Sequence, residues 1–225
     1  MQIKSILLVI AALAVGAQAQ EPGTQAVSTE QQAVTNDDRG RAFIIEQGSA
    51  PLFTVRPGGS VISEPQQYSI FLGSVWATPG MRAREAELAN LLVNVRDPAT
   101  LKALNEAGVK NLYGPTSSRE QLDDLTGSIS DLQIQNILSA MVKEGSLSAS
   151  TGNTIYVVFL GSNVHSTLGT MLAGKHYAAY HNFFNATGMK LHYVVVPFEA
   201  DRRTASQIAL RALAAAALNP RGETW

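Results

Sequence analysis

The sequence predicts a single α/β domain in which helices pack on a mixed β-sheet that includes a β-hairpin. Segments with helical periodicity separate two short β-prone apolar runs, at residues 68–76 and 153–161. Two further β-prone runs meet across residues 185–188, and an Ala-rich helical stretch follows them. This order of strand, helices, strand, hairpin and helix is typical of one sheet covered by helices.

The N-terminal residues are expected to lie outside this domain. Lys4 precedes an apolar run at residues 6–15 and a small-x-small triplet, which together indicate a secretory signal peptide over residues 1–19. The run is shorter than the roughly 20 apolar residues that a membrane anchor needs. Residues 20–41 are mostly polar and predict a flexible leader, so the domain is assigned to residues 42–225.

Composition narrows the range of functions. The 225 residues carry a formal net charge of −1 and contain no Cys. Because no basic face is present, nucleic acid is not an expected partner. No segment after the signal peptide is long and apolar enough to span a membrane, so no membrane association is expected once the signal peptide is removed. Disulfides cannot form, and stability must come from packing, which about 200 residues can supply.

The first part of the domain contains short strands and two helices. Apolar stretches at residues 42–45 and 52–55 predict edge strands, and the run at 68–76 predicts the first core strand. Apolar residues at helical spacing predict a helix over residues 83–95, which the following Asp-Pro ends. A shorter helix is then expected to end at Gly108.

Two capping boxes mark the start of two later helices. Ser130 is followed three positions later by Gln133, so the Ser hydroxyl and the Gln side chain can each satisfy a backbone amide of the first turn. Gly145 supplies the left-handed residue that ends this helix. Thr204 and Gln207 repeat the pattern before the Ala-rich helix. Between these helices, the run at residues 153–161 is apolar on both faces and predicts a central strand beside the first.

A metal site is one candidate for chemistry in this chain, because all four His residues fall in the segment from 165 to 192 and imidazole is the commonest metal ligand. If residues 185–188 form the hairpin loop, His181 and His192 face each other across the two strands, with Cβ atoms within about 5.5 Å. Glu199 and Asp201 follow the hairpin and are possible further ligands for zinc.

A structural role is the alternative for the same side chains. The two imidazoles would then be half-buried cross-strand partners, and Glu199 and Asp201 would complement the dipole of the last helix. A zinc site needs three or four ligands, and no further carboxylate has ligand spacing. The chain also lacks both Cys and a G-x-S-x-G nucleophile motif, so no catalytic residue is assigned.

Three segments carry a resemblance to a known family. The segments "NTIYVVFLGSNV", "GSVW" and "LAAAALNPRG" together resemble the phosphate-induced, Exordium-like family of secreted proteins, and the likeness extends from Tyr68 to Trp225. The resemblance implies a secreted protein with a similar central strand and a helix that ends in an Asn-Pro turn. Plant members are implicated in control of cell expansion, but they are rich in Cys, so that role is not carried over to this chain.

The stretch "YAAYHNFFNATGMKLHYVVVPF" is similar to exported bacterial and fungal relatives in which a helix carrying His-Glu-x-x-Glu follows. Aligning the Asn-Pro turns places Arg211 at the His, Ala212 at the first Glu and Ala215 at the second. The resemblance therefore implies a metal-binding helix that has lost its ligands, as in a pseudoenzyme. On this alignment, the Arg211 face of the helix is expected to look toward the hairpin histidines.

Two functions are expected from these observations. The first is a secreted, non-enzymatic protein, extracellular or periplasmic, that binds an extracellular protein or a cell-wall polysaccharide and holds no cofactor. Five aromatic residues are candidates for its binding surface, and core packing is the alternative for them: Trp76, Tyr177, Tyr180, Phe183 and Phe184. The second is a zinc-peptidase-like, metal-dependent hydrolase that uses His181 and His192.

Overall fold

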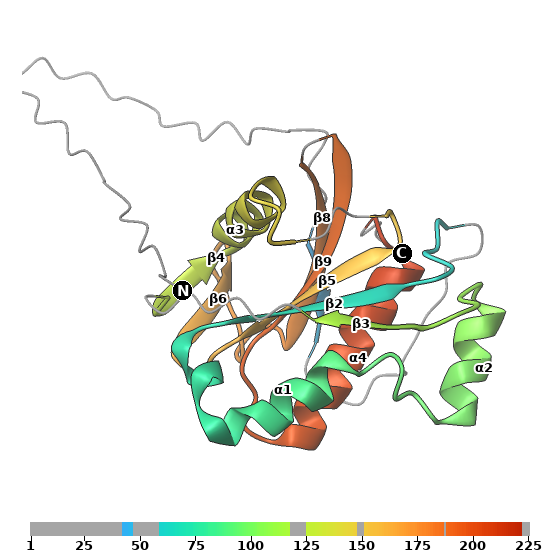
Figure 1. Ribbon diagram of the computed structural model, residues 1–225, viewed down its shortest axis with the longest axis horizontal. Helices are drawn as coiled ribbons and strands as arrows, with labels where there is room; N and C mark the ends of the chain where they lie inside the picture. Colours follow the sequence, from blue (N-terminus) through green and yellow to red (C-terminus); the bar gives the residue numbers. More distant parts are fainter. Residues whose placement is uncertain (1–41, 47–58, 118–124, 148–150, 187, 222–225) are drawn as a thin grey trace, which may run out of the picture. The chain divides into compact units, whose positions relative to one another are not determined.

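The computed structural model describes residues 42–46, 59–117, 125–147, 151–186 and 188–221 (Figure 1). The predicted signal peptide at 1–19, the leader at 20–41 and the second edge strand at 52–55 lie outside the described residues. The described part is an α/β fold with a mixed sheet, a β-hairpin and helices packed on the sheet, as predicted from the sequence.

Within the described residues, six strands form the main sheet in the order β1-β8-β9-β5-β2-β3. Strands β9, β5, β2 and β3 run parallel, whereas β8 runs antiparallel between β9 and β1. The short edge strand expected at residues 42–45 is confirmed as β1. The strand bounds are β1 Phe43–Ile45, β2 Gln66–Leu72, β3 Tyr113–Ser117, β5 Thr154–Leu160, β8 Ala179–Ala186 and β9 Met189–Val196.

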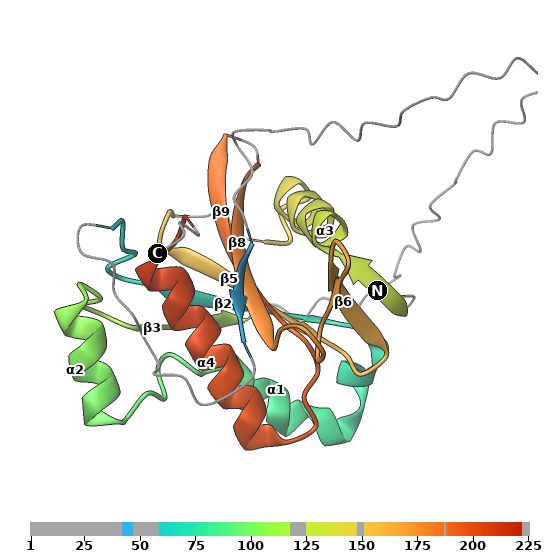
Figure 2. The ribbon, with the colours of Figure 1, turned by 180° about the vertical axis from the view of Figure 1, so that it is seen from behind.

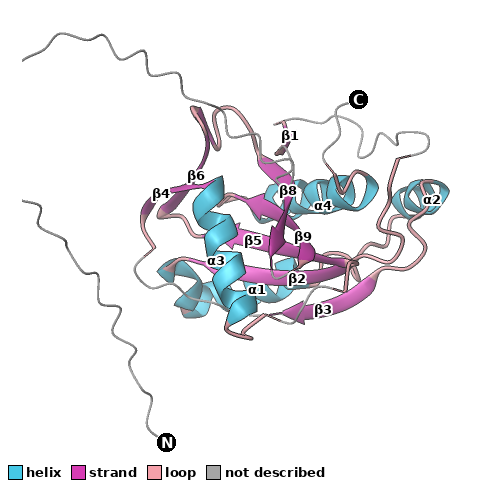
Figure 3. Cartoon of the chain, turned by 90° about the horizontal axis from the view of Figure 1, so that it is seen from above, coloured by secondary structure: helices cyan, strands magenta, loops and turns pink. Residues whose placement is uncertain are grey.

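Helices cover both faces of this sheet (Figure 2). One hydrophobic core joins the sheet to α1 (Arg82–Ala89), α2 (Pro98–Glu106) and α4 (Arg202–Leu218). The other core joins the opposite face to α3 (Asp131–Lys143), as the view from above shows (Figure 3). Short 3-10 turns, Ser74–Ala77 and Pro79–Met81, connect β2 to α1.

A second, smaller sheet was not expected from the sequence. It contains β4 (Gly127–Ser130), β6 (Val164–Leu168) and β7 (Met171–Leu172) in the order β4-β6-β7. Strand β4 leads directly into α3, and both contact β6. This sheet therefore extends the layer on the α3 side of the molecule.

Strand β5 shows why the sheet has a core on each face. Its seven residues are all buried, because alternate side chains point to opposite faces and both faces are covered. Ile155, Val157 and Phe159 enter the core beneath α4, whereas the intervening side chains enter the core beneath α3. The predicted central strand and its pairing with the first core strand are both confirmed, since β5 pairs in parallel with β2.

Helix starts follow the local capping chemistry. The capping box at Ser130 is confirmed, because the Ser130 hydroxyl accepts from the Gln133 amide and the Gln133 side chain accepts from the Ser130 amide at 2.8 Å. The second predicted box was wrong. Helix α4 begins at Arg202, and Asp201 is its N-cap, with the carboxylate accepting from the Thr204 amide at 2.7 Å. An Asp three residues earlier outcompetes Thr204 for the cap position.

The helix predicted over residues 83–95 is shorter in the structure and ends at Ala89. The Asn90 side chain donates to the Ala86 carbonyl at 2.7 Å. This hydrogen bond satisfies a carbonyl that a longer helix would pair with the backbone amide of residue 90. Residues 90–94 continue as turns, with the Asn94 amide bonded to the Asn90 carbonyl. The apolar residues beyond Ala89 therefore still reach the core.

The predicted hairpin register was wrong by two residues. Ala186 pairs with Met189, so only two residues lie between the strands instead of four. Gly188 adopts a φ of 78°, the positive value that a two-residue hairpin turn requires. As a result, His181 lies opposite Val194 and His192 lies opposite Phe183.

Candidate functional site

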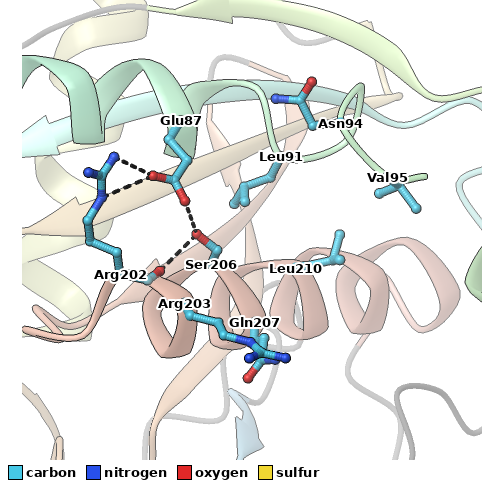
Figure 4. A pocket seen from close by; sticks show the side chains of 9 residues that line it. All are labelled: Glu87, Leu91, Asn94, Val95, Arg202, Arg203, Ser206, Gln207 and Leu210. Carbon is cyan, nitrogen blue, oxygen red and sulfur yellow. Dashed lines mark hydrogen bonds and ion pairs between the residues drawn. The ribbon is translucent and has the colours of Figure 1, made fainter. Parts of the chain in front are cut away.

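A groove between α1 and α4 is the candidate functional site (Figure 4). Its cavity volume is about 570 Å³. Side chains from α1 and the turns after it form one wall, and side chains from the first half of α4 form the other. The lining residues are Glu87, Leu91, Asn94 and Val95 on the first wall and Arg202, Arg203, Ser206, Gln207 and Leu210 on the second.

Helical spacing explains which residues of α4 face the groove. Positions 202, 206 and 210 are four residues apart, as are positions 203 and 207. Side chains at this spacing lie above one another on one helix face. On the other wall Glu87 belongs to α1, whereas Leu91, Asn94 and Val95 follow the end of that helix.

A hydrogen-bonded cluster occupies one end of the groove. Arg202 donates to one carboxylate oxygen of Glu87 from both Nε, at 3.2 Å, and Nη2, at 2.7 Å. Ser206 Oγ lies 3.0 Å from the other Glu87 oxygen and 3.0 Å from the Arg202 carbonyl oxygen. The paired side chains are 58% and 39% exposed, so the ion pair contributes only about 0–1 kcal/mol to stability. Its main effect is to fix the position of Glu87.

The other end of the groove is apolar. Leu91 and Val95 are buried, and Leu210 is half-buried beside them. Asn94 and Gln207 are exposed on opposite walls. The groove therefore combines an apolar floor with a polar rim, which is the usual composition of a small-ligand site.

Arg84 fixes the position of α1 relative to the start of α4. Its guanidinium donates to the carbonyls of Glu199 and Ala200 and lies over the Phe198 ring, 4.8 Å from the ring centre. Burial lowers the pKa of Arg84, and the nearby charge of Arg202 lowers it further. These contacts join residues 115 and 116 positions apart in sequence and hold α1 against the segment that leads into α4.

The two predicted acidic ligands lie at the start of α4. The Glu199 carboxylate accepts from the Asp201 amide at 3.0 Å, and the Asp201 carboxylate caps the helix. Hydrogen bonds from the hydroxyl and amide of Thr204 lower the pKa of Asp201. Both side chains therefore stabilise the N-terminus of α4, which is the role that the sequence predicts for them as the alternative to metal binding.

The two hairpin histidines lie on the sheet face beneath α4. His181 is 1% exposed and stacks on Phe43, with ring centres 5.0 Å apart. Its Nε2 has no hydrogen-bond partner among the described residues. Burial, with a smaller contribution from the charge of His192, lowers the pKa of His181 to about 3. The imidazole is therefore neutral at physiological pH.

His192 is held by the chain beyond α4. Its Nδ1 lies 3.0 Å from the Pro220 carbonyl oxygen, so this nitrogen carries the proton and donates. Burial lowers the pKa of His192, and the bond to Pro220 partly opposes that shift. The contact anchors the Asn-Pro turn to β9.

The predicted zinc ligands are not brought together. Glu199 and Asp201 lie before α4, whereas His192 contacts Pro220 beyond its other end. A helix of 17 residues is about 25 Å long, far more than a metal site spans. In the part of the chain that the structure describes, no group of three or more His, Asp or Glu side chains is placed to hold a metal ion.

The expected orientation of Arg211 toward the hairpin histidines stays a prediction. Ala212 is 0% exposed and packs into the core against the sheet, in one row with Ala205, Ala209 and Ala216. Arg211 is half-exposed and lies about 100° around the helix axis from Ala212. Positions 211 and 212 therefore point to different sides of the helix, and Ala212 is the one that packs on the sheet.

The five candidate aromatic residues do not form an exposed surface. Trp76 is buried beneath α4, against Phe71 and Phe198. Tyr177, Tyr180 and Phe184 are buried in the core on the other face, and Phe183 alone of the five is half-exposed. Core packing, the alternative reading, accounts for four of them.

A buried polar cluster beneath α3 was missed by the sequence reasoning. Asp131 accepts from the Tyr193 hydroxyl at 2.5 Å, from Gln135 at 2.9 Å and from Asn182 at 3.1 Å. The Tyr180 hydroxyl is buried nearby, without a hydrogen-bond partner in the described part of the chain. Burial, together with the Asp131 charge, raises the pKa of both Tyr180 and Tyr193 well above 10. This cluster joins α3 to the hairpin.

The sequence reasoning also missed the groove. The faces of α1 and α4 follow from their spacing, but their contact joins residues 115 to 119 positions apart. No local signal indicates which two helix faces will lie side by side. Their convergence follows from the sheet order, which places β2 and β9 on either side of β5.

Comparison of the chain with protein-family models, with curated protein sequences and with solved structures found no match. The Exordium-like resemblance therefore stays a prediction from sequence motifs. A search of the described helices for one that is both long enough and apolar enough to cross a membrane also found none.

Proposed function

We propose that this protein is exported and acts by binding an extracellular ligand in the α1–α4 groove, without catalysing a reaction. The observation that carries the proposal is the groove itself, about 570 Å³ in volume, with an apolar floor and a polar rim. The ligand is part of a partner protein, part of a wall polymer, or a free small molecule. Export is supported by the signal-like N-terminus and by the resemblance to secreted Exordium-like proteins.

A binding role agrees with the chemistry of the lining. Acid–base catalysis commonly uses two titratable groups with different pKa values. Among the described lining residues, Glu87 is the sole carboxylate, and both its oxygens already accept hydrogen bonds. No imidazole lines the described walls. The groove thus supplies donors, acceptors and apolar contact rather than a reactive pair.

Filling the groove tests this proposal. Gln207 is exposed on one wall, and Gln207→Trp would occupy the cavity without entering the core. Wild type and variant are compared in capture of secreted proteins and wall polysaccharides. Lys102→Trp on α2, at a side chain 76% exposed, is the matched control. We expect capture by wild type and Lys102→Trp and its loss in Gln207→Trp. Equal capture by all three proteins would refute binding in the groove, whereas capture by none would exclude proteins and wall polysaccharides and leave a free small molecule as the ligand.

A metal-dependent hydrolase is the second candidate function. The observation that favours it is that His181 Nε2 has no hydrogen-bond partner within the described residues and that His181 lies on the same sheet face as His192. The bond from His192 Nδ1 to a carbonyl would leave its Nε2 free to bind zinc. Metal analysis of purified protein tests this candidate. One zinc per chain in wild type and in His165→Ala, but none in His181→Ala, would favour the hydrolase over the binding protein.

A further inference from the structure

Polar and apolar groups are separated along the length of the α1–α4 groove. On α4, the wall begins with Arg202 and Arg203, continues one turn later with Ser206 and Gln207, and ends a further turn later with Leu210. The span from 202 to 210 is about 12 Å of helix. The opposite wall follows the same order, from Glu87 to Leu91 to Val95 (Figure 4). One end is therefore charged on both walls and the other is apolar on both walls.

The charged end has a net positive charge. The groove is lined by two guanidinium groups and one carboxylate, and both oxygens of Glu87 already accept hydrogen bonds from Arg202 and Ser206, whereas Arg203 extends to Gln207 (Figure 4). Arg202 uses Nε and Nη2 for that pair and retains Nη1. Arg203 is exposed on the rim beside Gln207 (Figure 4). These donors complement an anionic group, and a carboxylate matches the fork geometry of a guanidinium.

The apolar end selects against flat or polar ligands. None of the described lining residues is aromatic, so a sugar ring or a base would have no stacking partner in these walls. Leu91, Val95 and Leu210 instead offer aliphatic contact. Each methylene group buried there would raise affinity by about fourfold.

We infer that the α1–α4 groove binds a free aliphatic carboxylate of medium chain length, with its head group at Arg203 and its chain along Leu91, Val95 and Leu210. This inference rests on the proposed function and names the chemical class of the ligand. The two parts of the ligand match the two ends of the groove, and neither an aliphatic cation nor a neutral sugar does so.

The test is titration of the full-length protein with octanoate, octylammonium and octanol by calorimetry. We expect octanoate to bind, octanol to bind more weakly and octylammonium to bind least. Arg203→Gln should weaken octanoate binding about tenfold and leave octanol unchanged, because it removes a charge-assisted contact. Leu210→Asn should weaken both ligands. Raising the salt concentration should weaken octanoate alone, because salt screens exposed charges.

Matched controls are available on the surface outside the groove. Arg82 is exposed on α1 and Leu101 is 39% exposed on α2, so Arg82→Gln and Leu101→Asn should leave all three affinities unchanged. Octylammonium binding as tightly as octanoate, or an Arg203→Gln variant with unchanged octanoate affinity, would overturn the inference. If Gln207→Trp still abolished capture of extracellular material, the proposed function would stand and only the ligand class would be wrong. Stronger binding of a neutral polysaccharide than of octanoate would likewise show that the ligand class is wrong and leave the proposed function intact.

Discussion

Burial of His181 should make the stability of this protein fall as the pH drops below neutrality. The imidazole is 1% exposed in the folded protein, and burial lowers its pKa from the ordinary 6.5 to about 3. Between these two values, the unfolded chain binds a proton that the folded chain does not. Stability must therefore rise with pH across this window and reach its full value above about pH 7.5.

The magnitude follows from the two pKa values. Each unit of difference corresponds to about 1.4 kcal/mol, so the full shift from 6.5 to about 3 amounts to about 5 kcal/mol of stability, which is lost completely only below about pH 3. At pH 5 the loss is about 2 kcal/mol relative to pH 7.5. His192 adds a loss of the same sign, because burial lowers its pKa too. Asp97 and Asp201, whose hydrogen bonds lower their pKa values, act with the same sign at more acidic pH.

Urea unfolding at pH 5, 6 and 7.5, followed by the fluorescence of buried Trp76, measures this slope. His181→Leu removes the titrating group, so the free energy of unfolding of this variant should fall by about 2 kcal/mol less than that of wild type between pH 7.5 and pH 5. His165→Leu, at an exposed position, should keep the wild-type slope. The reasoning fails if wild type and His181→Leu lose the same stability over this range.

Four further substitutions test the packing. Tyr193→Phe should lower the free energy of unfolding by about 1–2 kcal/mol, because it removes the hydroxyl bonded to Asp131. Tyr180→Phe should leave that free energy unchanged or raise it, because the Tyr180 hydroxyl has no hydrogen-bond partner among the described residues. Equal effects of the two variants in denaturant unfolding would contradict these assigned hydrogen bonds. Ser130→Ala should cost about 1 kcal/mol by removing the α3 cap, and an unchanged melting temperature would contradict that role. Ala212→Glu should cost at least about 3 kcal/mol by burying an unpaired carboxylate; a fully folded variant of wild-type stability would show that α4 faces the sheet differently.

Elements with strong local signals could be predicted from the sequence. After Thr154, strand β5 is an unbroken run from Ile155 to Leu160 with no charged or strongly polar side chain, as expected of a strand covered on both faces, and the structure buries all seven residues. The α3 start depends on two side chains three residues apart, and both hydrogen bonds form. Each of these signals lies within one element, so no knowledge of the rest of the fold was needed.

The hairpin shows where local signals were not sufficient. The strands were correctly placed, but the same sequence is compatible with a turn of two or four residues, and the choice moves every cross-strand pair by two positions. His181 therefore lies opposite Val194 and not His192. The histidines still share a sheet face, because a shift of two preserves the alternation of side chains. The face was predictable from the sequence, but the pairing was not.

The smaller sheet shows a different limit. Strand β6 reads Val-His-Ser-Thr-Leu, with no apolar run to mark it, and its pairing with β4 joins residues far apart in sequence. Ser166 is fully buried because its hydroxyl accepts from Tyr177 at 2.9 Å. A polar residue that is buried by a partner elsewhere in the chain cannot be distinguished from a loop residue by composition alone.

The Ala-rich sequence of α4 is explained by packing and does not require a lost active site. Ala205, Ala209, Ala212 and Ala216 form the row that faces the sheet, and small side chains let the helix approach β8 and β9 closely. A reactive side chain on that row would be buried among apolar atoms, where a charge is costly. The polar residues of α4 that could contact a ligand lie instead on the side that faces α1, from Arg202 to Gln207. If α4 contributes to function, this second face is where the contribution is made, and the Ala-rich face positions it.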